Sequence, residues 1–170
     1  MSQIKIFKEN KGYSLMEMIV VISLLGVVGV IVSGFLISTM KANSKAEITK
    51  EVRQNGDYVL SVLQGAILNS LSVSCTNPSA NIKIIRVTDL NNQITDYTCN
   101  ITEKKISSGS ARLTGTNIAV TNCIFSCNTT SGRPTKVTID FTIGNKSSTN
   151  LRPEEKSSVN FKSEVITRNY

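Results

Sequence analysis

Histidine is absent from this chain of 170 residues. Its absence excludes a Ser-His-Asp or Cys-His nucleophile system and any metal site with imidazole ligands. Tryptophan is also absent, and aromatic residues make up only 5% of the chain. The sequence has neither a glycine-rich phosphate loop nor a carboxylate cluster of the kind found in active sites. We therefore expect neither catalysis nor a bound cofactor.

Apolar residues are concentrated in one uninterrupted block near the N-terminus. Hydrophobic residues make up 40% of the chain, and the block 18–40 contains no charged residue, no Asn or Gln, and no Pro. As a helix, the block would be about 35 Å long, which is enough to cross the hydrocarbon core of a bilayer. We therefore expect a transmembrane segment here, with one soluble domain in the rest of the chain.

Basic residues flank this block on both sides, and the formal net charge is +7. The basic residues before the block are Lys5, Lys8 and Lys11, and those after it are Lys41, Lys45, Lys50 and Arg53. Because both flanks are basic, the positive-inside rule does not fix the orientation. A modest basic excess usually forms a solvated surface, with contact to nucleic acid as the alternative.

Beyond residue 40 the sequence becomes amphipathic with a helical period. The apolar residues of one stripe are Val52, Val59, Leu60, Leu63, Ile67 and Leu71, with Ala66 at its edge. Asn55-Gly56 is a turn signal inside this stretch, but the stripe keeps its register across it. The pattern therefore predicts one continuous or gently kinked helix from Tyr13 to about Leu71, before the polar run 74–78.

The rest of the chain alternates short apolar stretches with polar turns. The strand at 137–143 alternates apolar and polar residues, which is typical of a half-buried strand. Further strands are predicted at 118–125, 159–165, 82–87 and 94–98, and loops at 107–110, 128–135 and 144–158. Since an amphipathic helix and a one-sided sheet need each other to bury their apolar faces, we expect an α+β fold. In it, a long N-terminal helix, membrane-spanning in its first half, packs its amphipathic second half on an antiparallel β-sheet.

The four cysteines, Cys75, Cys99, Cys123 and Cys127, all lie beyond the apolar block. An even count in a part of the chain that can be exported predicts disulfides, and the spacing lacks the paired knuckles of a zinc site. Because Cys123 and Cys127 would be about 13 Å apart in an extended strand, we expect Cys75 and Cys99 as their partners, in either connectivity. A bulge would instead permit a local Cys123–Cys127 loop, which leaves Cys75 with Cys99.

The junction before the apolar block carries the most specific pattern, Lys11-Gly12-Tyr13-Ser14-Leu15-Met16-Glu17. It resembles the cleavage and methylation motif of type IV pilins and type II secretion pseudopilins. In that family a basic leader ends in Gly, an aromatic residue or Met follows, and a Glu stands at the fifth mature position. Gly12, Tyr13 and Glu17 occupy these places here. Tyr13 replaces the commoner Phe, and Met16 stands where Ile or Val is usual.

The resemblance implies how the chain is processed and divided. A prepilin peptidase and methyltransferase of the inner membrane would cut between Gly12 and Tyr13 and N-methylate Tyr13. The chain would comprise a leader at 1–12, a hydrophobic transmembrane and assembly helix at 13–40, an amphipathic helix at 41–72, and a β-rich pilin head at 73–170. The leader stays in the cytoplasm, so the head and its cysteines reach the oxidising side, first at the bacterial inner membrane and then in a cell-surface filament.

Glu17 is an unusual residue at the edge of a membrane helix. A carboxylate there costs roughly 1–3 kcal/mol, depending on depth, unless a partner neutralises it. The resemblance implies a partner, because cleavage frees the α-amino group of Tyr13, which can pair with Glu17 of a neighbouring subunit. Such a pair would fix the axial register between helices. The alternative is that Glu17 lies at headgroup depth.

These features predict a structural subunit of a type IV pilus or type II secretion-like filament. The tail at 157–169 resembles the end of minor pilins and pseudopilins, which favours a minor subunit. Its partners would be the peptidase, other pilin or pseudopilin subunits, the inner-membrane assembly platform and membrane lipid. Two other hypotheses are a DNA-uptake pseudopilin whose basic surface contacts DNA, and a single-pass membrane protein with an extracytoplasmic binding domain that never polymerises.

Overall fold

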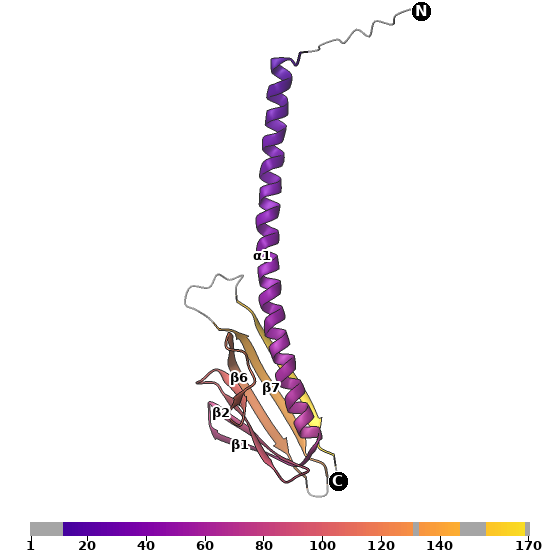
Figure 1. Ribbon diagram of the computed structural model, residues 1–170, viewed down its shortest axis with the longest axis vertical. Coiled ribbons are helices and arrows are strands. Elements are labelled where there is room, and N and C mark those ends of the chain that lie inside the picture. The colour runs from indigo at the N-terminus through magenta and orange to yellow at the C-terminus, as the bar shows by residue number, and fades with distance from the viewer. Residues whose placement is uncertain (1–11, 131–132, 147–155, 169–170) are drawn as a thin grey trace, which may run out of the picture. The chain divides into compact units, whose positions relative to one another are not determined.

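The computed structural model describes residues 12–130, 133–146 and 156–168. The predicted leader up to residue 11, residues 131–132 of the predicted loop 128–135, the centre of the predicted loop 144–158 and the last residue of the predicted tail therefore lie outside the described part. The chain divides into two compact units, Met1–Lys41 and Ala42–Tyr170, which we call the first and second units. Figure 1 shows the order of the elements along the chain.

Helix α1 spans Leu15–Leu68 without a break, so the predicted continuous helix is confirmed. The residues that it buries in the second unit share one stripe and are Val52, Gly56, Val59, Leu63 and Ile67. The helix ends earlier than expected, because Ser70 already begins a strand and its hydroxyl donates a hydrogen bond to the carbonyl oxygen of Ile67 at 2.7 Å. Leu71, predicted on the helical stripe, lies in that strand and is 43% exposed.

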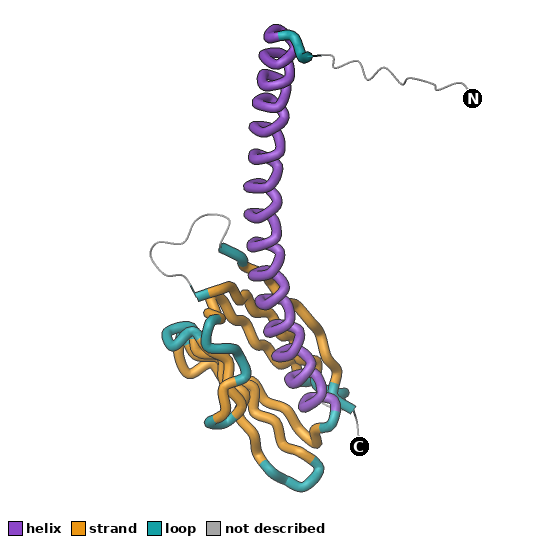
Figure 2. Tube along the Cα trace, turned by 45° about the horizontal axis from the view of Figure 1, so that its top comes forward, coloured by secondary structure: helices purple, strands orange, loops and turns teal. Residues whose placement is uncertain are grey.

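The strands form two antiparallel sheets where the sequence predicts one. The five-stranded sheet has the order β1 (Ser70–Ser79), β2 (Ile82–Asp89), β3 (Ile94–Asn100), β4 (Lys105–Ser108) and β5 (Ala111–Arg112). The three-stranded sheet consists of β6 (Ile118–Asn128), β7 (Lys136–Asn145) and β8 (Ser158–Ile166). The α+β class, with a long N-terminal helix on antiparallel sheets, is confirmed (Figure 2).

Strands β1, β4 and β5 were not predicted. β1 contains the polar run 74–78, and it pairs on one side only, with β2. An edge strand tolerates a proline, and Pro78 falls at the irregularity between Thr76 and Ser79. In the predicted loop 107–110, Ser107 and Ser108 belong to β4, and the turn to β5 uses Gly109 with a φ of +54°.

The core of the second unit is shared by α1 and the inner faces of both sheets. The four apolar residues predicted on one face of β7, namely Val137, Ile139, Phe141 and Ile143, are all buried. Across the three-stranded sheet, Phe141 pairs with Cys123 of β6 and with Phe161 of β8. Two side-chain hydrogen bonds connect α1 to the region of β8. Thr49 bonds to Ser157, just before β8, at 3.0 Å, and Gln64 donates to Ser163 within β8 at 2.7 Å.

Two disulfides join the five-stranded sheet to β6. Cys75 of β1 bonds to Cys127, and Cys99 of β3 bonds to Cys123, with Cα–Cα distances of 5.4 and 6.6 Å. Cys123 and Cys127 lie on the same face of β6, each beside an exposed neighbour. The structure therefore has one of the two expected connectivities, and the local Cys123–Cys127 loop is not formed.

Peptide mapping under non-reducing conditions checks this connectivity. We expect one disulfide-linked peptide pair that contains Cys75 and Cys127, and another that contains Cys99 and Cys123. A sample alkylated before digestion serves as the control against thiol exchange. Recovery of a Cys75–Cys99 peptide, or of four free thiols from exported protein, would contradict the structure.

Two cross-strand ion pairs lie on the polar surface of the sheets. Arg86 of β2 donates two hydrogen bonds to Asp96 of β3, both at 2.7 Å. These bonds, more than the attraction between the charges, lower the pKa of Asp96. The hydrogen bond from Lys136 likewise lowers the pKa of Glu164. Since both groups are well exposed, the pairs serve mainly to fix strand register.

Candidate processing and assembly site

The backbone between Gly12 and Tyr13 is open to an enzyme. Gly12, Tyr13 and Ser14 precede α1 and belong to no regular element. Tyr13 is 79% exposed, and no atom of the described residues lies within 4 Å of the position that a Cβ on Gly12 would take. A peptidase can therefore bind this stretch as extended chain without first unfolding a helix.

Glu17 stands in the first turn of α1. The carbonyl oxygen of Ser14 begins the helix, because it accepts hydrogen bonds from the backbone N–H of Glu17 at 3.0 Å and of Met18 at 3.2 Å. A carboxylate in the first turn is favoured by the helix dipole. Glu17 is exposed and forms no ion pair within residues 12–130, 133–146 and 156–168. Its side chain is therefore available to a partner.

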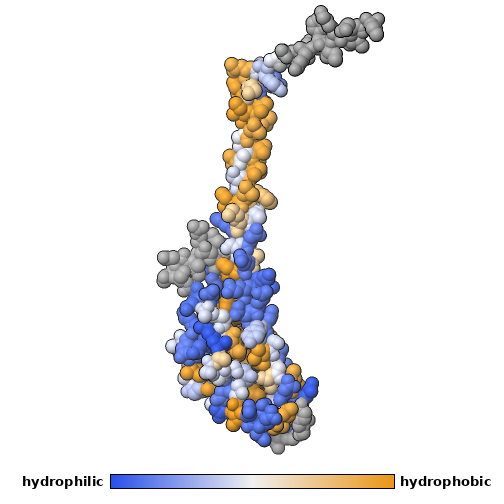
Figure 3. Space-filling view, in the orientation of Figure 1, coloured by the Kyte–Doolittle hydropathy of each residue, from blue (hydrophilic) through white to orange (hydrophobic). Residues whose placement is uncertain are grey.

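The apolar part of α1 is uncovered. The large hydrophobic side chains between residues 18 and 40 are all exposed, from 45% for Val21 to 76% for Val30. Figure 3 shows this continuous hydrophobic surface, which gives way to hydrophilic side chains on the second unit. Within the described residues, α1 is the one helix that is long and apolar enough to cross a membrane. An apolar surface of this extent needs lipid or neighbouring helices to cover it.

Three of the four hydroxyl groups in this segment form hydrogen bonds within the helix. Ser23 donates to the carbonyl oxygen of Val20 at 2.8 Å, and Ser33 to that of Gly29 at 2.8 Å. Thr39 donates to the carbonyl oxygen of Phe35 at 2.9 Å. Because hydrocarbon offers no hydrogen-bond partners, such bonds allow the three polar side chains to lie in lipid.

The structure places the predicted site residues in two separate groups. Gly12, Tyr13 and Glu17 fall within six positions at the start of α1, whereas the cysteines lie in the strands of the second unit. The first group is the candidate processing and assembly site, and the second stabilises the fold. Sequence reasoning missed the division into two sheets, which the two disulfides join, although the spread of the cysteines over about 50 residues was the available signal.

Comparison with known proteins supports this view of the N-terminus. Residues 7–33 match the prokaryotic N-terminal methylation motif. This motif is the signal of type IV pilins and pseudopilins, and the match includes Gly12, Tyr13 and Glu17. Neither a search of curated proteins nor a search of solved structures finds a match. The chain therefore carries the pilin and pseudopilin signal, which supports a pilin-like structural subunit anchored by its apolar helix.

Proposed function

We propose that this chain is a minor pilin or pseudopilin that is cut after Gly12 and built through α1 into a type IV pilus or type II secretion-like filament. One observation supports this most strongly: the matched motif at residues 7–33 extends into an apolar helix surface that is exposed along its whole length, from Met18 to Met40. Lipid covers that surface while the subunit is in the inner membrane. The corresponding helices of neighbouring subunits cover it in the filament.

In this proposal Glu17 and the α-amino group of Tyr13 hold neighbouring subunits in register. Cleavage creates the amino group at the start of the mature chain, four residues before Glu17. Each charge is unfavourable in an apolar filament core, and pairing between subunits offsets that cost for both. The exposed position of Glu17 and its lack of an ion pair within the described residues support this role.

The same proposal sets orientation and partners. The basic leader stays in the cytoplasm, where an inner-membrane prepilin peptidase cuts it and methylates Tyr13. The second unit lies on the oxidising side, which suits its two disulfides. An inner-membrane assembly platform then adds the subunit to other pilins or pseudopilins. The role is structural and requires no catalysis by this chain.

Processing gives a direct test of the cleavage site. Co-expressed with an active prepilin peptidase, the full chain should yield a mature protein that begins with N-methylated Tyr13. Gly12→Val should leave the precursor essentially uncut, because a branched side chain replaces hydrogen where the peptidase must approach the backbone. Intact mass of membrane-extracted protein distinguishes these forms.

Ser14→Ala is the matched control, since it lies on the other side of Tyr13 and keeps the backbone carbonyl that begins α1. It should be cut normally. A wild-type mass that retains residues 1–12 in the presence of the peptidase would refute the proposed cleavage.

A further inference from the structure

Four exposed lysines gather at the end of the second unit where the chain arrives from the apolar segment. They are Lys45 on α1, Lys104 before β4, Lys146 after β7 and Lys156 before β8. We call them the basic rim. The motif and the proposed assembly contact leave them without a role.

Hydrogen bonds place Lys156 and Lys146 beside the first turns of the part of α1 that belongs to the second unit. Thr49, one turn after Lys45, bonds to Ser157 at 3.0 Å. Two hydrogen bonds join Ser157 to Asn145. The carbonyl oxygen of Ser157 accepts one from the backbone N–H of Asn145 at 3.2 Å, and the backbone N–H of Ser157 donates one to the side-chain oxygen of Asn145 at 3.0 Å. Lys146 and Lys156 directly follow and precede this pair, so both belong to the same end of the unit as Lys45.

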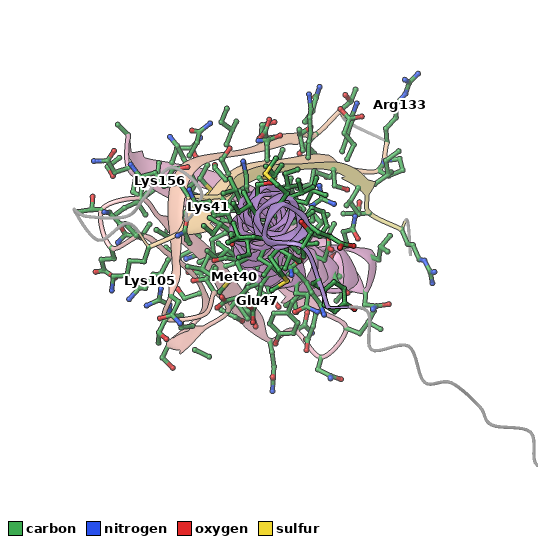
Figure 4. All side chains as sticks on the ribbon, turned by 90° about the horizontal axis from the view of Figure 1, so that it is seen from above. Met40, Lys41, Glu47, Lys105, Arg133 and Lys156 are labelled. Atoms are coloured by element: carbon green, nitrogen blue, oxygen red, sulfur yellow. A yellow bond between two sulfur atoms is a disulfide. The ribbon has the colours of Figure 1, made fainter. Side chains whose placement is uncertain are left out.

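The start of β6 brings Lys104 to the same end. The backbone N–H of Lys146 donates a hydrogen bond to the carbonyl oxygen of Asn117 at 2.6 Å. The backbone N–H of Val120 donates one to the carbonyl oxygen of Lys104 at 3.3 Å. Figure 4 shows Lys156 and Lys105, the neighbour of Lys104 in the chain, on one side of the second unit and Arg133 on the other. The rim is therefore a local concentration of positive charge.

Within the described residues, none of the four ammonium groups forms an ion pair. By contrast, the nearby Lys105 pairs with Glu103, and Lys136 of β7 pairs with Glu164. Lys45 precedes Val52 and Val59 at intervals of seven residues, so it lies on the same helical stripe, and it is exposed.

The acidic residues of this part of the helix lie on another side of it. Each residue turns the helix by about 100°. Glu47 therefore lies about 160° around the helix axis from Lys45, and Glu51 about 120° from it. They therefore leave the rim without a neutralising carboxylate from α1.

Chain connectivity keeps Lys45 of the rim close to the end of the apolar segment. Lys45 follows Met40, the last apolar residue of the span, by five positions, which is about 7.5 Å along a helix. The polar headgroup layer of a bilayer is roughly 5–8 Å thick on each side. The long lysine side chains can extend to phosphate groups at that depth. This step rests on the proposed membrane-embedded state of the subunit.

We propose that the basic rim binds the anionic phospholipid headgroups of the leaflet from which the second unit emerges. Before assembly, each subunit would then be held by its apolar helix and by contacts between lysine ammonium and lipid phosphate. The charge of the rim, the closeness of Lys45 to the span along the chain and the lack of an ion pair at these lysines within the described residues all match an anionic bilayer surface.

Lipid binding by the full mature chain in detergent tests this directly. Native mass spectrometry would compare phosphatidylglycerol with phosphatidylcholine of the same acyl chains. We expect phosphatidylglycerol to be preferred, with a loss of about fivefold for each rim lysine replaced by Gln. A variant with all four replaced should show a preference ratio near one, and Lys→Arg at the same positions should restore it.

The matched control removes equal charge elsewhere, by Gln at Lys83, Arg133, Lys162 and Arg168, and should keep the preference. An equal loss in this control would mean that net charge alone matters, and would overturn the proposal. A double-stranded oligonucleotide that displaces phosphatidylglycerol at about 150 mM salt would also overturn it, in favour of nucleic acid as the partner. Because lipid binding is measured on the isolated chain, it can succeed or fail independently of filament incorporation.

Discussion

Gly56→Ala should destabilise the second unit, although alanine in a helix interior normally stabilises by about 1 kcal/mol relative to glycine. A Cβ on Gly56 would lie 2.1 Å from Cζ of Phe161, and two further ring atoms would be within 2.6 Å. The ring cannot easily move, because Phe161 is buried and stacks on Phe141 with centroids 5.3 Å apart. Overpacking of this kind costs about 1–3 kcal/mol and the contact is very close, so after the helix gain we expect a net loss of up to about 2 kcal/mol.

Thermal unfolding of the full chain in detergent, followed by near-ultraviolet circular dichroism, measures this effect. Gly65→Ala is the matched control, since Gly65 lies in the same helix with nothing within 4 Å of its Cβ position. It should raise the midpoint, whereas Gly56→Ala should lower it. In the Phe161→Leu background the penalty of Gly56→Ala should shrink, because the smaller side chain leaves room. If Gly56→Ala and Gly65→Ala both raised the unfolding midpoint, the helix at Gly56 would not pack against the ring of Phe161 as closely as the structure shows.

The pair Asn55-Gly56 shows why local sequence signals can mislead. As a dipeptide it favours a turn, yet both residues sit inside α1 for tertiary reasons. The side-chain oxygen of Asn55 accepts a hydrogen bond from the backbone N–H of Gly115 at 2.9 Å. Gly56 leaves space for the ring of Phe161. Gly115 and Phe161 are both far from Asn55-Gly56 in the sequence. Only the regular spacing of apolar residues before and after Asn55-Gly56 could therefore predict the helix.

Strand prediction succeeded where burial alternates and failed where it does not. In β7 every second residue is buried, and this alternation is visible in the residue types. β1 buries few residues, and its polar composition resembles a loop. It is held by pairing with β2 and by the Cys75–Cys127 disulfide, which are long-range features. The pairing of the cysteines also depends on long-range structure. The presence of four cysteines therefore predicted disulfides but did not distinguish between the two connectivities.

The candidate site depends less on long-range structure than the fold does. Gly12, Tyr13 and Glu17 lie within one short segment, so their spacing in the sequence already defines the site. The basic rim could not be predicted in this way. Its lysines come from four separate segments, and strand pairing and the contact of Thr49 with Ser157 bring them to one end.

Glu17→Ala should abolish incorporation into the filament while leaving insertion, cleavage and folding intact. Alanine is easier to place in a bilayer than a carboxylate, so the membrane step is not impaired. In the filament, however, each added subunit would bury an α-amino group of Tyr13 without a counter-charge. Breaking a buried ion pair on one side costs about 3–5 kcal/mol. At about 1.4 kcal/mol per factor of ten, incorporation should fall by about two to four orders of magnitude.

Glu17→Gln separates charge from hydrogen bonding, because it keeps an acceptor and removes the attraction. We expect it to be nearly as defective as the Ala variant. Glu47→Ala is the matched control, since Glu47 is an exposed glutamate on the same helix beyond the apolar span, and it should be incorporated normally. The measurement is the fraction of subunit that co-purifies with sheared filaments, relative to the fraction left in the membrane. Normal incorporation of Glu17→Ala would mean that Glu17 is only a headgroup-level residue, and would favour a membrane protein that does not polymerise.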